Sequence, residues 1–139
     1  MTFTERPDGQ VDATLGPEWP LFNEALYDAI SSLPPRGAAG VGPSTYWIDI
    51  ASACARQAAE SGDERPFTGG NITVLRVLRG RVVASYEWYE EEHETEDQWE
   101  AISLADFLDL LQRWRDLVVA SAERATETLP DTYRRNPHR

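Results

Sequence analysis

Residues 73–86 read TVLRVLRGRVVASY, two β-rich runs that meet at Arg79-Gly80. A pair of residues that ends in Gly is typical of the tight turn of a β-hairpin. A turn at this point places three cross-strand pairs on one side of the hairpin: Val77 with Val82, Leu75 with Ala84, and Thr73 with Tyr86. We therefore expect an antiparallel hairpin in this register, with that apolar side toward the core. The other side is expected to be largely solvated and carries Val74, Arg76, Val83 and Ser85.

The sequence after this hairpin predicts a third strand and a long helix. A short strand is expected over residues 98–102. Ser103 and Asp106 then resemble a capping box, with Asp in place of the usual Glu. They open the strongest helical pattern in the chain, which runs from Leu104 to about residue 128. Its apolar stripe contains Leu104, Phe107, Leu108, Leu111, Trp114 and Val118.

Two helices are expected before the hairpin. The first spans residues 17–33, where apolar side chains recur at helical spacing. The second spans residues 44–61, with Ser44 as its N-cap and Gly62 as its stop. Residues 45–50 could instead form a short strand. The buried face of the second helix is expected to contain Trp47, Ile50, Ala51, Cys54 and Ala58.

The order of these elements predicts an α+β fold: two N-terminal helices, a three-stranded antiparallel meander, and a long C-terminal helix packed on the sheet. A length of 139 residues suits one domain, which we expect over residues 17–129. Residues 1–16 lack periodicity and are expected to form a flexible arm. Residues 130–139 are expected to form a flexible basic tail.

The composition favours a soluble intracellular protein. Residues 1–16 contain no apolar run of the signal-peptide kind, and no stretch approaches the roughly 18 apolar residues of a membrane span. Cys54 is the only cysteine, which excludes a disulfide within the chain and an all-cysteine zinc site. We therefore expect a cytoplasmic location. All thirteen basic side chains are Arg, which we interpret as the codon bias of a GC-rich, bacterial genome.

The formal charge of −11 is concentrated in one part of the chain. Between Arg81 and Arg113 lie ten acidic side chains and no Arg or Lys. The acidic residues are Glu87, Glu90, Glu91, Glu92, Glu94, Glu96, Asp97, Glu100, Asp106 and Asp109. Such an excess should repel nucleic acid and anionic membranes, and should attract basic proteins or cations.

The most acidic part of this region is the candidate binding site. Rigid aromatic side chains, including the neighbouring Trp99, can supply contact area while carboxylates pair with the basic side chains of a partner. So many adjacent like charges repel one another, and a neutralising partner would relieve that repulsion. The surface predicted to bind a basic protein consists of Glu87, Trp88, Tyr89, Glu90, Glu91, Glu92, Glu94, Glu96 and Asp97. The alternative is a solvated hairpin tip that protects an edge strand from aggregation.

Metal binding and catalysis are two further possibilities. A divalent cation would use carboxylate and imidazole ligands from Glu90, Glu92, His93, Glu94 and Glu96. Their spacing matches neither an EF-hand loop nor the two-histidine helix of zinc proteases. Cys54 has no neighbouring histidine in the sequence, and no serine lies in a nucleophile-elbow pattern. We expect a non-enzymatic protein without a cofactor or a specific metal; the alternative is a metal-dependent enzyme that uses the acidic cluster.

The long C-terminal helix suggests a different kind of interaction. Its apolar stripe is wide because Leu110 and Leu117 flank it, and Trp114 could serve dimerisation instead of the core. A homodimer with a structural or regulatory role is therefore a further alternative. We expect Trp114 to pack in the core.

Several short motifs between residues 70 and 114 can be taken together. They are Gly70-Asn71-Ile72-Thr73-Val74-Leu75, Gly80-Arg81-Val82-Val83, Tyr86 with its trailing glutamates, and Leu104-Ala105-Asp106-Phe107-Leu108 followed by Leu110, Leu111 and Trp114. In this combination the chain resembles small actinobacterial immunity proteins, the antidotes encoded beside polymorphic or contact-dependent toxins. The resemblance extends over about residues 44–118. It implies a small, acidic, non-enzymatic protein that binds a cognate toxin, and it implies no catalytic residue.

Overall fold

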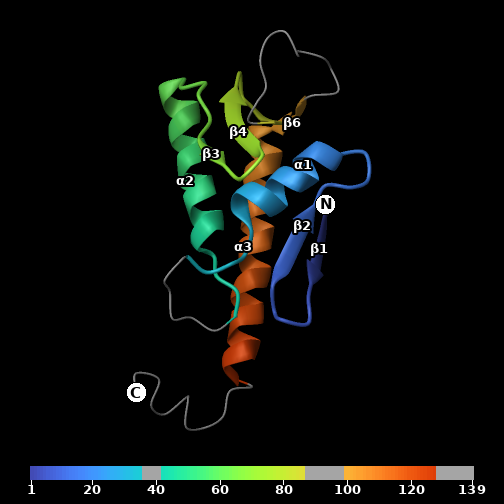
Figure 1. Cartoon of the computed structure of the whole chain (residues 1–139). Helices are drawn as coiled ribbons and strands as arrows, with labels where there is room; N and C mark the ends of the chain where they lie inside the picture. The colour runs from blue at the N-terminus through green and yellow to red at the C-terminus, as the bar shows by residue number, and fades with distance from the viewer. Residues whose placement is uncertain (36–41, 87–98, 128–139) are drawn as a thin grey trace.

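The computed structural model describes residues 1–35, 42–86 and 99–127, with side chains as far as residue 124 (Figure 1). This part of the chain contains three α-helices and two antiparallel sheets, so the predicted α+β class is confirmed. The elements in order are β1 (Thr2–Glu5), β2 (Val11–Thr14), α1 (Pro20–Ala25), a π-helical turn η1 (Leu26–Ile30), α2 (Tyr46–Ser61), β3 (Thr68–Gly69), β4 (Thr73–Leu78), β5 (Arg81–Tyr86), β6 (Trp99–Ser103) and α3 (Leu104–Glu127).

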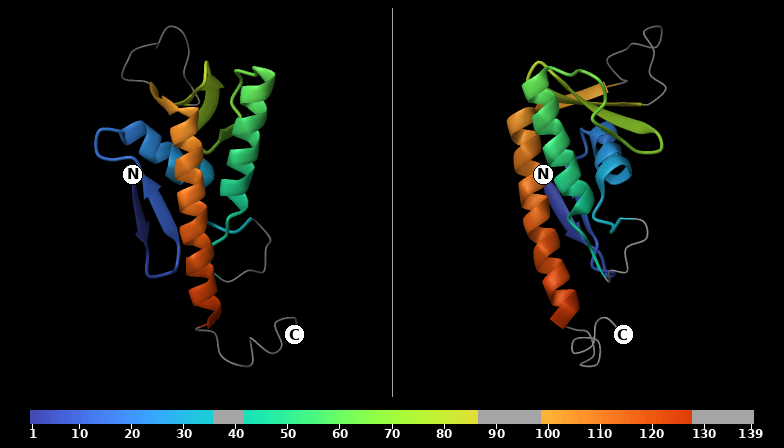
Figure 2. Two further views of the ribbon diagram at one scale, coloured as in Figure 1. Left: turned by 180° about the vertical axis from the view of Figure 1, so that it is seen from behind. Right: turned by 90° about the vertical axis from the view of Figure 1, so that its left-hand side faces the viewer.

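The long helix α3 organises the fold. It lies between α2 on one side and the β1–β2 hairpin on the other (Figure 1). Figure 2 shows α2 and α3 side by side from two further directions, with the four-stranded sheet at the amino-terminal end of α3. The largest fully buried side chains come from several elements and include Trp114, Phe22, Phe107, Leu26 and Ile48. One continuous core therefore joins the helices to both sheets.

Strands β4 and β5 form the predicted hairpin in the predicted register. Val77 pairs with Val82, Leu75 with Ala84, and Thr73 with Tyr86. Arg79 and Gly80 have φ angles of 51° and 76°, the left-handed values of a two-residue turn whose twist matches the strands. The predicted apolar side of the hairpin faces the core.

The other side of this hairpin is not solvated, and that prediction is wrong. Val74, Val83 and Ser85 are buried, and Ser85 is only 3% exposed. The physical reason is that β4 and β5 are both interior strands, since β3 pairs with β4 and β6 pairs with β5. Small side chains on interior strands are shielded by neighbours on adjacent strands. The predicted three-stranded meander is therefore part of a four-stranded sheet, because β3 was missed.

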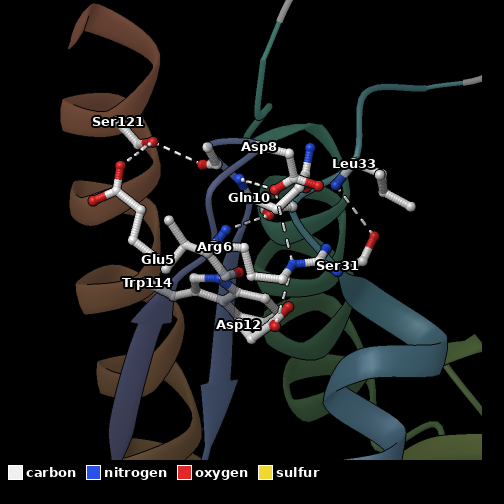
Figure 3. Close-up of polar contacts among 12 residues, drawn as sticks. Glu5, Arg6, Asp8, Gln10, Asp12, Ser31, Leu33, Trp114 and Ser121 are labelled. Carbon is white, nitrogen blue, oxygen red and sulfur yellow. Dashed lines mark hydrogen bonds and ion pairs between the residues drawn. The ribbon is translucent and has the colours of Figure 1, made fainter. Parts of the chain in front are cut away.

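Residues 1–16 form a β-hairpin, which corrects the prediction of a flexible arm. Val11 and Ala13 are buried, and the backbone turns at Gly9, whose φ is 90°. The hydroxyl of Ser121 on α3 shares its one proton between two acceptors, the carbonyl oxygen of Gly9 at 2.7 Å and the Glu5 carboxylate at 2.9 Å (Figure 3). Four-residue strands are too short to produce a recognisable alternation, so the sequence pattern did not reveal them.

The predicted helix over 17–33 is shorter than expected and has two parts, α1 and η1. A turn in which the Trp19 amide donates to Gly16 occupies the predicted first residues. The helix ends at Ser31, whose φ of 64° is outside the helical range. Trp19, the residue at the N-cap position, makes no side-chain hydrogen bond to the helix.

Helix α2 has the predicted end, and Ala51 and Ala58 are buried as predicted, but Trp47, Ile50 and Cys54 are not. Thr45 occupies the N-cap position in place of Ser44, and Gly62 is the left-handed C-cap. The residues that face the core are Ile48, Ala51, Ala55 and Ala58. Trp47 is 37% exposed and Cys54 is only half-buried. Four of the residues from 47 to 51 are apolar, so the pattern alone allows more than one buried face.

Helix α3 begins where the capping box predicted. The backbone amide of Asp106 donates to the Ser103 hydroxyl at 3.0 Å. Trp114 is 1% exposed, which confirms its place in the core and leaves it unavailable for display to a second copy. Leu110, predicted to flank the stripe, is fully buried, while Leu117 is exposed.

Two predictions concern residues that the structure does not describe. Residue 98, the expected start of the third strand, and the predicted tail 130–139 lie outside the described residues. Among the residues that are described, no helix is both long and apolar enough to cross a membrane.

Candidate functional site

The residues predicted to bind a partner lie between two adjacent strands. Glu87, Trp88, Tyr89, Glu90, Glu91, Glu92, Glu94, Glu96 and Asp97 all fall in 87–98, outside the described residues. The strands on either side are described, and Ser85 of β5 pairs directly with Trp99 of β6. Segment 87–98 therefore joins two neighbouring strands at one end of the sheet. Its seven carboxylates are tethered at that end by both termini.

The described end of the sheet carries further negative charge. Burial raises the pKa of the Tyr86 phenol, and the carboxylates of Glu24 on α1 and Glu100 on β6 raise it further. Both carboxylates therefore lie close enough to Tyr86, the last residue of β5, to affect its phenol electrostatically.

Glu100 has a structural role that the sequence pattern did not reveal. Its carboxylate accepts hydrogen bonds from the backbone amides of Leu21 at 3.2 Å and Phe22 at 2.7 Å. These amides belong to the first turn of α1, whose free N–H groups attract a carboxylate. Glu100 thus supplies the cap that Trp19 does not, and it fastens α1 to β6 next to the acidic segment.

Two of the other acids outside segment 87–98 also serve the fold. Asp109 pairs with Arg113 at 3.0 Å, one turn further along α3. Asp106 lies in the first turn of α3, where negative charge is favourable. The acids between Arg81 and Arg113 therefore divide into three that support the fold and seven that lie in the connecting segment.

Arginines of the body pair with carboxylates of the body. The pairs are Arg6 with Asp8 and Asp12, Arg65 with Asp63, Arg113 with Asp109, Arg115 with Asp49, and Arg124 with Glu5. Most of these side chains are well exposed, so each pair contributes little to stability.

Trp99 lies at the point where segment 87–98 meets β6. Its side chain is 37% exposed, whereas most large apolar side chains of the sheet are buried. An exposed tryptophan beside a group of carboxylates is a suitable anchor for a partner. In the sequence, its position next to the acidic run was the signal that indicated this role.

The shallow grooves in the described residues include one of about 310 Å³ that is lined by Pro43, Thr45 and Val118 among others, and two smaller ones. One, of about 270 Å³, lies between α2 and α3 and is lined by Ile48, Leu111 and Arg115 among others. The second, of about 220 Å³, includes Cys54 and Asp63. No histidine lines either groove, so Cys54 has no imidazole base there.

The arrangement of potential metal ligands is known for the described part of the chain. Ranges 1–35, 42–86 and 99–127 contain no group of three or more His, Cys, Asp or Glu side chains arranged to hold an ion. His93 and the glutamates considered with it as ligands lie outside these ranges.

Comparison of the chain with protein-family models, with curated proteins and with solved structures found no significant match. The relevant residues are the acidic segment, its two anchoring strands, and the charged and aromatic side chains where those strands end.

Proposed function

We propose that the chain is a non-enzymatic, acidic binding protein of the bacterial cytoplasm that acts as an immunity protein. In this proposal the chain binds a basic toxin or effector domain and covers its substrate-binding surface. The observation that carries the proposal is the tethering of seven carboxylates between β5 and β6, next to the exposed Trp99.

Electrostatics supports a basic partner for this end of the sheet. The carboxylates of segment 87–98, Glu24 and Glu100 all carry the same charge, and a positive surface would relieve their repulsion. A local field of this kind can raise the rate of encounter with a basic protein by about 10- to 1,000-fold at low salt. The aromatic side chains Trp88, Tyr89 and Trp99 would then slow dissociation.

A charge-reversal variant with a matched control tests the proposal. Glu90→Arg, Glu92→Arg and Glu94→Arg combined should weaken binding of the native partner by about 100-fold or more. The control combines Glu60→Arg, Glu64→Arg and Glu123→Arg, which makes the same change in net charge at exposed positions of α2, the following loop and α3. Its affinity should remain close to that of the wild type.

The measurement begins with capture of the partner from native cells on immobilised wild-type chain, followed by titration of the purified partner with all three proteins. The captured protein should be basic, and its expression alone should arrest growth that the wild-type chain restores. Equal affinity of both reversed variants would refute the acidic segment as the binding surface. A captured protein without effect on growth would refute the immunity role.

A further inference from the structure

The arginines of the β4–β5 hairpin differ from the paired arginines of the body. Arg76, Arg79 and Arg81 form no ion pair and no side-chain hydrogen bond with any described residue. Arg56, the other described arginine without a carboxylate partner, donates to the Ser52 hydroxyl. Three positive charges without a partner in the described chain therefore lie close together in residues 76–81.

These three side chains gather at the turn of the hairpin. Arg79 is the first residue of the turn, and Arg81 pairs with Leu78 directly after it. Because alternate residues of a strand share a face, Arg76 and Arg81 both lie on the side of the hairpin that faces away from the core. Arg79 and Arg81 are exposed, and Arg76 is half-buried. Their guanidinium groups make this end of the hairpin locally positive.

The start of α3 lies beside the same turn. The Leu104 amide donates to the carbonyl oxygen of Gly80 at 2.9 Å, which places the positive end of the helix dipole next to the arginines. Asp106 is the acid in the first turn of α3, and it forms an ion pair with none of the three arginines. The described chain therefore supplies no direct counter-charge to them.

Arg79 has an unfavourable backbone conformation for its residue type. Its φ of 51° lies in the left-handed region, where Asn, Asp or Gly is usual at the first position of such a turn. The Arg79 side chain makes no hydrogen bond or ion pair in the described fold that would compensate for this strain. We therefore expect the benefit of an arginine here to come from a contact outside the fold.

The guanidinium groups determine the chemistry of a suitable partner. An arginine binds a carboxylate or a phosphate through two parallel hydrogen bonds. A long polyanion such as nucleic acid is repelled by the formal charge of −11, and three arginines neutralise only about three phosphates. A short protein segment with a few carboxylates needs no longer contact, and the half-buried Leu78 on the same face gives it an apolar surface. An acidic protein segment therefore fits this surface better than a nucleic acid.

We propose that Arg76, Arg79 and Arg81, here named the arginine turn, bind an acidic segment of a protein partner. Carboxylates of that segment pair with the three guanidinium groups beside the positive end of α3. The inference goes beyond the proposed function, because it concerns a different surface and a partner segment of opposite charge. It does not depend on segment 87–98.

Three fluorescently labelled probes distinguish the possible ligands. The first is a short synthetic peptide that alternates Glu and Ser, the second has Gln in place of each Glu, and the third is single-stranded oligo-dT of the same length. Fluorescence anisotropy at low salt measures their binding to the wild-type chain. The Glu-Ser peptide should bind at least about tenfold more tightly than either of the others, since charge-assisted hydrogen bonds are stronger than neutral ones.

A triple variant with a matched control tests whether the arginine turn is the binding surface. Arg76→Gln, Arg79→Asn and Arg81→Gln combined should bind the Glu-Ser peptide at least about tenfold more weakly than the wild type. A control with the same change in net charge should bind the peptide within about twofold of the wild type. Circular dichroism checks that both variants are folded. The control carries substitutions at three exposed positions elsewhere, Arg56→Gln, Arg65→Gln and Arg113→Gln.

Arg79→Asn alone separates a binding role from a structural one. Asparagine tolerates the left-handed conformation, so the urea concentration at the midpoint of unfolding should stay the same or rise. A lower midpoint would mean that the Arg79 side chain serves the fold, which contradicts the proposal.

The peptide titrations can also overturn the proposal. Equal affinity of the triple variant and its control for the Glu-Ser peptide would exclude the arginine turn as the binding surface, and equal affinity of the wild type for the Glu-Ser and Gln-Ser peptides would exclude an acidic ligand. Tighter binding of oligo-dT than of the Glu-Ser peptide would indicate a nucleic acid in place of an acidic protein segment. None of these results bears on the basic partner, because segment 87–98 is unchanged in every variant.

Discussion

Replacing Trp114 with Ala is expected to lower the free energy of unfolding by about 4–5 kcal/mol, near the upper end for loss of a buried aromatic side chain. Trp114 is 1% exposed, and its indole N–H donates to the carbonyl oxygen of Val11 at 2.7 Å. The side chain thus joins α3 to β2. Its removal opens a cavity and leaves the Val11 carbonyl without a donor. Guanidinium unfolding followed by circular dichroism measures the effect.

Trp114→Phe is the matched control for this experiment. Phenylalanine keeps much of the apolar contact but lacks the N–H, so we expect a loss of about 1–3 kcal/mol. The loss for Trp114→Phe reports mainly the hydrogen bond to Val11. The additional loss for Trp114→Ala reports the packing of the aromatic side chain. A loss below about 1 kcal/mol for Trp114→Ala would contradict the place of this side chain in the core.

Replacing Asp28 with Ala is expected to lower the free energy of unfolding by about 2–3 kcal/mol near neutral pH. Its carboxylate accepts hydrogen bonds from the backbone amides of Asn71 at 2.9 Å and of Ile72 and Thr73 at 3.1 Å, and from the Thr73 hydroxyl at 2.8 Å. These bonds fasten η1 to the turn that opens β4. Without the carboxylate, four donors lose their acceptor.

Asp116→Ala is the control for Asp28→Ala, since Asp116 is exposed and accepts one hydrogen bond, from Gln112 at 2.9 Å. It should change stability by no more than about 0.5 kcal/mol. Urea unfolding near neutral pH compares the two variants. An equal, small effect of both would show that Asp28 does not hold the start of β4.

The pH dependence of stability gives an independent check on Asp28. Burial raises the pKa of this carboxyl, but the hydrogen bonds from residues 71–73 lower it more, so its pKa in the folded protein lies below the ordinary value. Such a group stabilises the fold above its unfolded-state pKa of about 4, and this stabilisation is lost as the pH falls through the folded-state value. The wild type should therefore lose more stability than Asp28→Ala between about pH 7 and pH 3. Equal losses would contradict this role.

The elements predicted correctly from the sequence are those with strong local signals. The hairpin of β4 and β5 has a turn dipeptide and enough residues to fix its register. The start of α3 has its own cap in Ser103. Both signals lie within a few residues of the structure that they specify, so no knowledge of the distant chain was needed.

The elements that were missed depend on distant contacts or on too few residues. Strands β1 and β3 are short, and each is held by pairing and packing and not by its own pattern. Asp28 and Glu100 accept hydrogen bonds from backbone amides far away in the sequence. The sequence around each of these residues gives no sign of that contact. The buried face of α2 was misplaced because its apolar residues allow several faces, and contact with α3 and β4 selects one.

The sequence predicted the position of the candidate site along the chain but not the role of each acidic residue near it. The run of acids between the two predicted strands located it at the end of the sheet, and the pairing of Ser85 with Trp99 agrees with that position. Sequence did not separate the acids that support the fold, such as Glu100 and Asp109, from those in segment 87–98. The roles of Glu100 and Asp109 depend on contacts with a backbone amide and an arginine that only the folded structure brings together.

Labelling of carboxylates by a water-soluble carbodiimide, read out by mass spectrometry, most directly tests whether segment 87–98 binds the partner. The free chain and its complex with the captured partner are labelled under the same conditions. We expect Glu90, Glu92 and Glu94 to lose most of their labelling in the complex, while Glu60 and Glu123 on the body stay labelled. Unchanged labelling of the segment in a saturated complex, with protection elsewhere, would contradict the account.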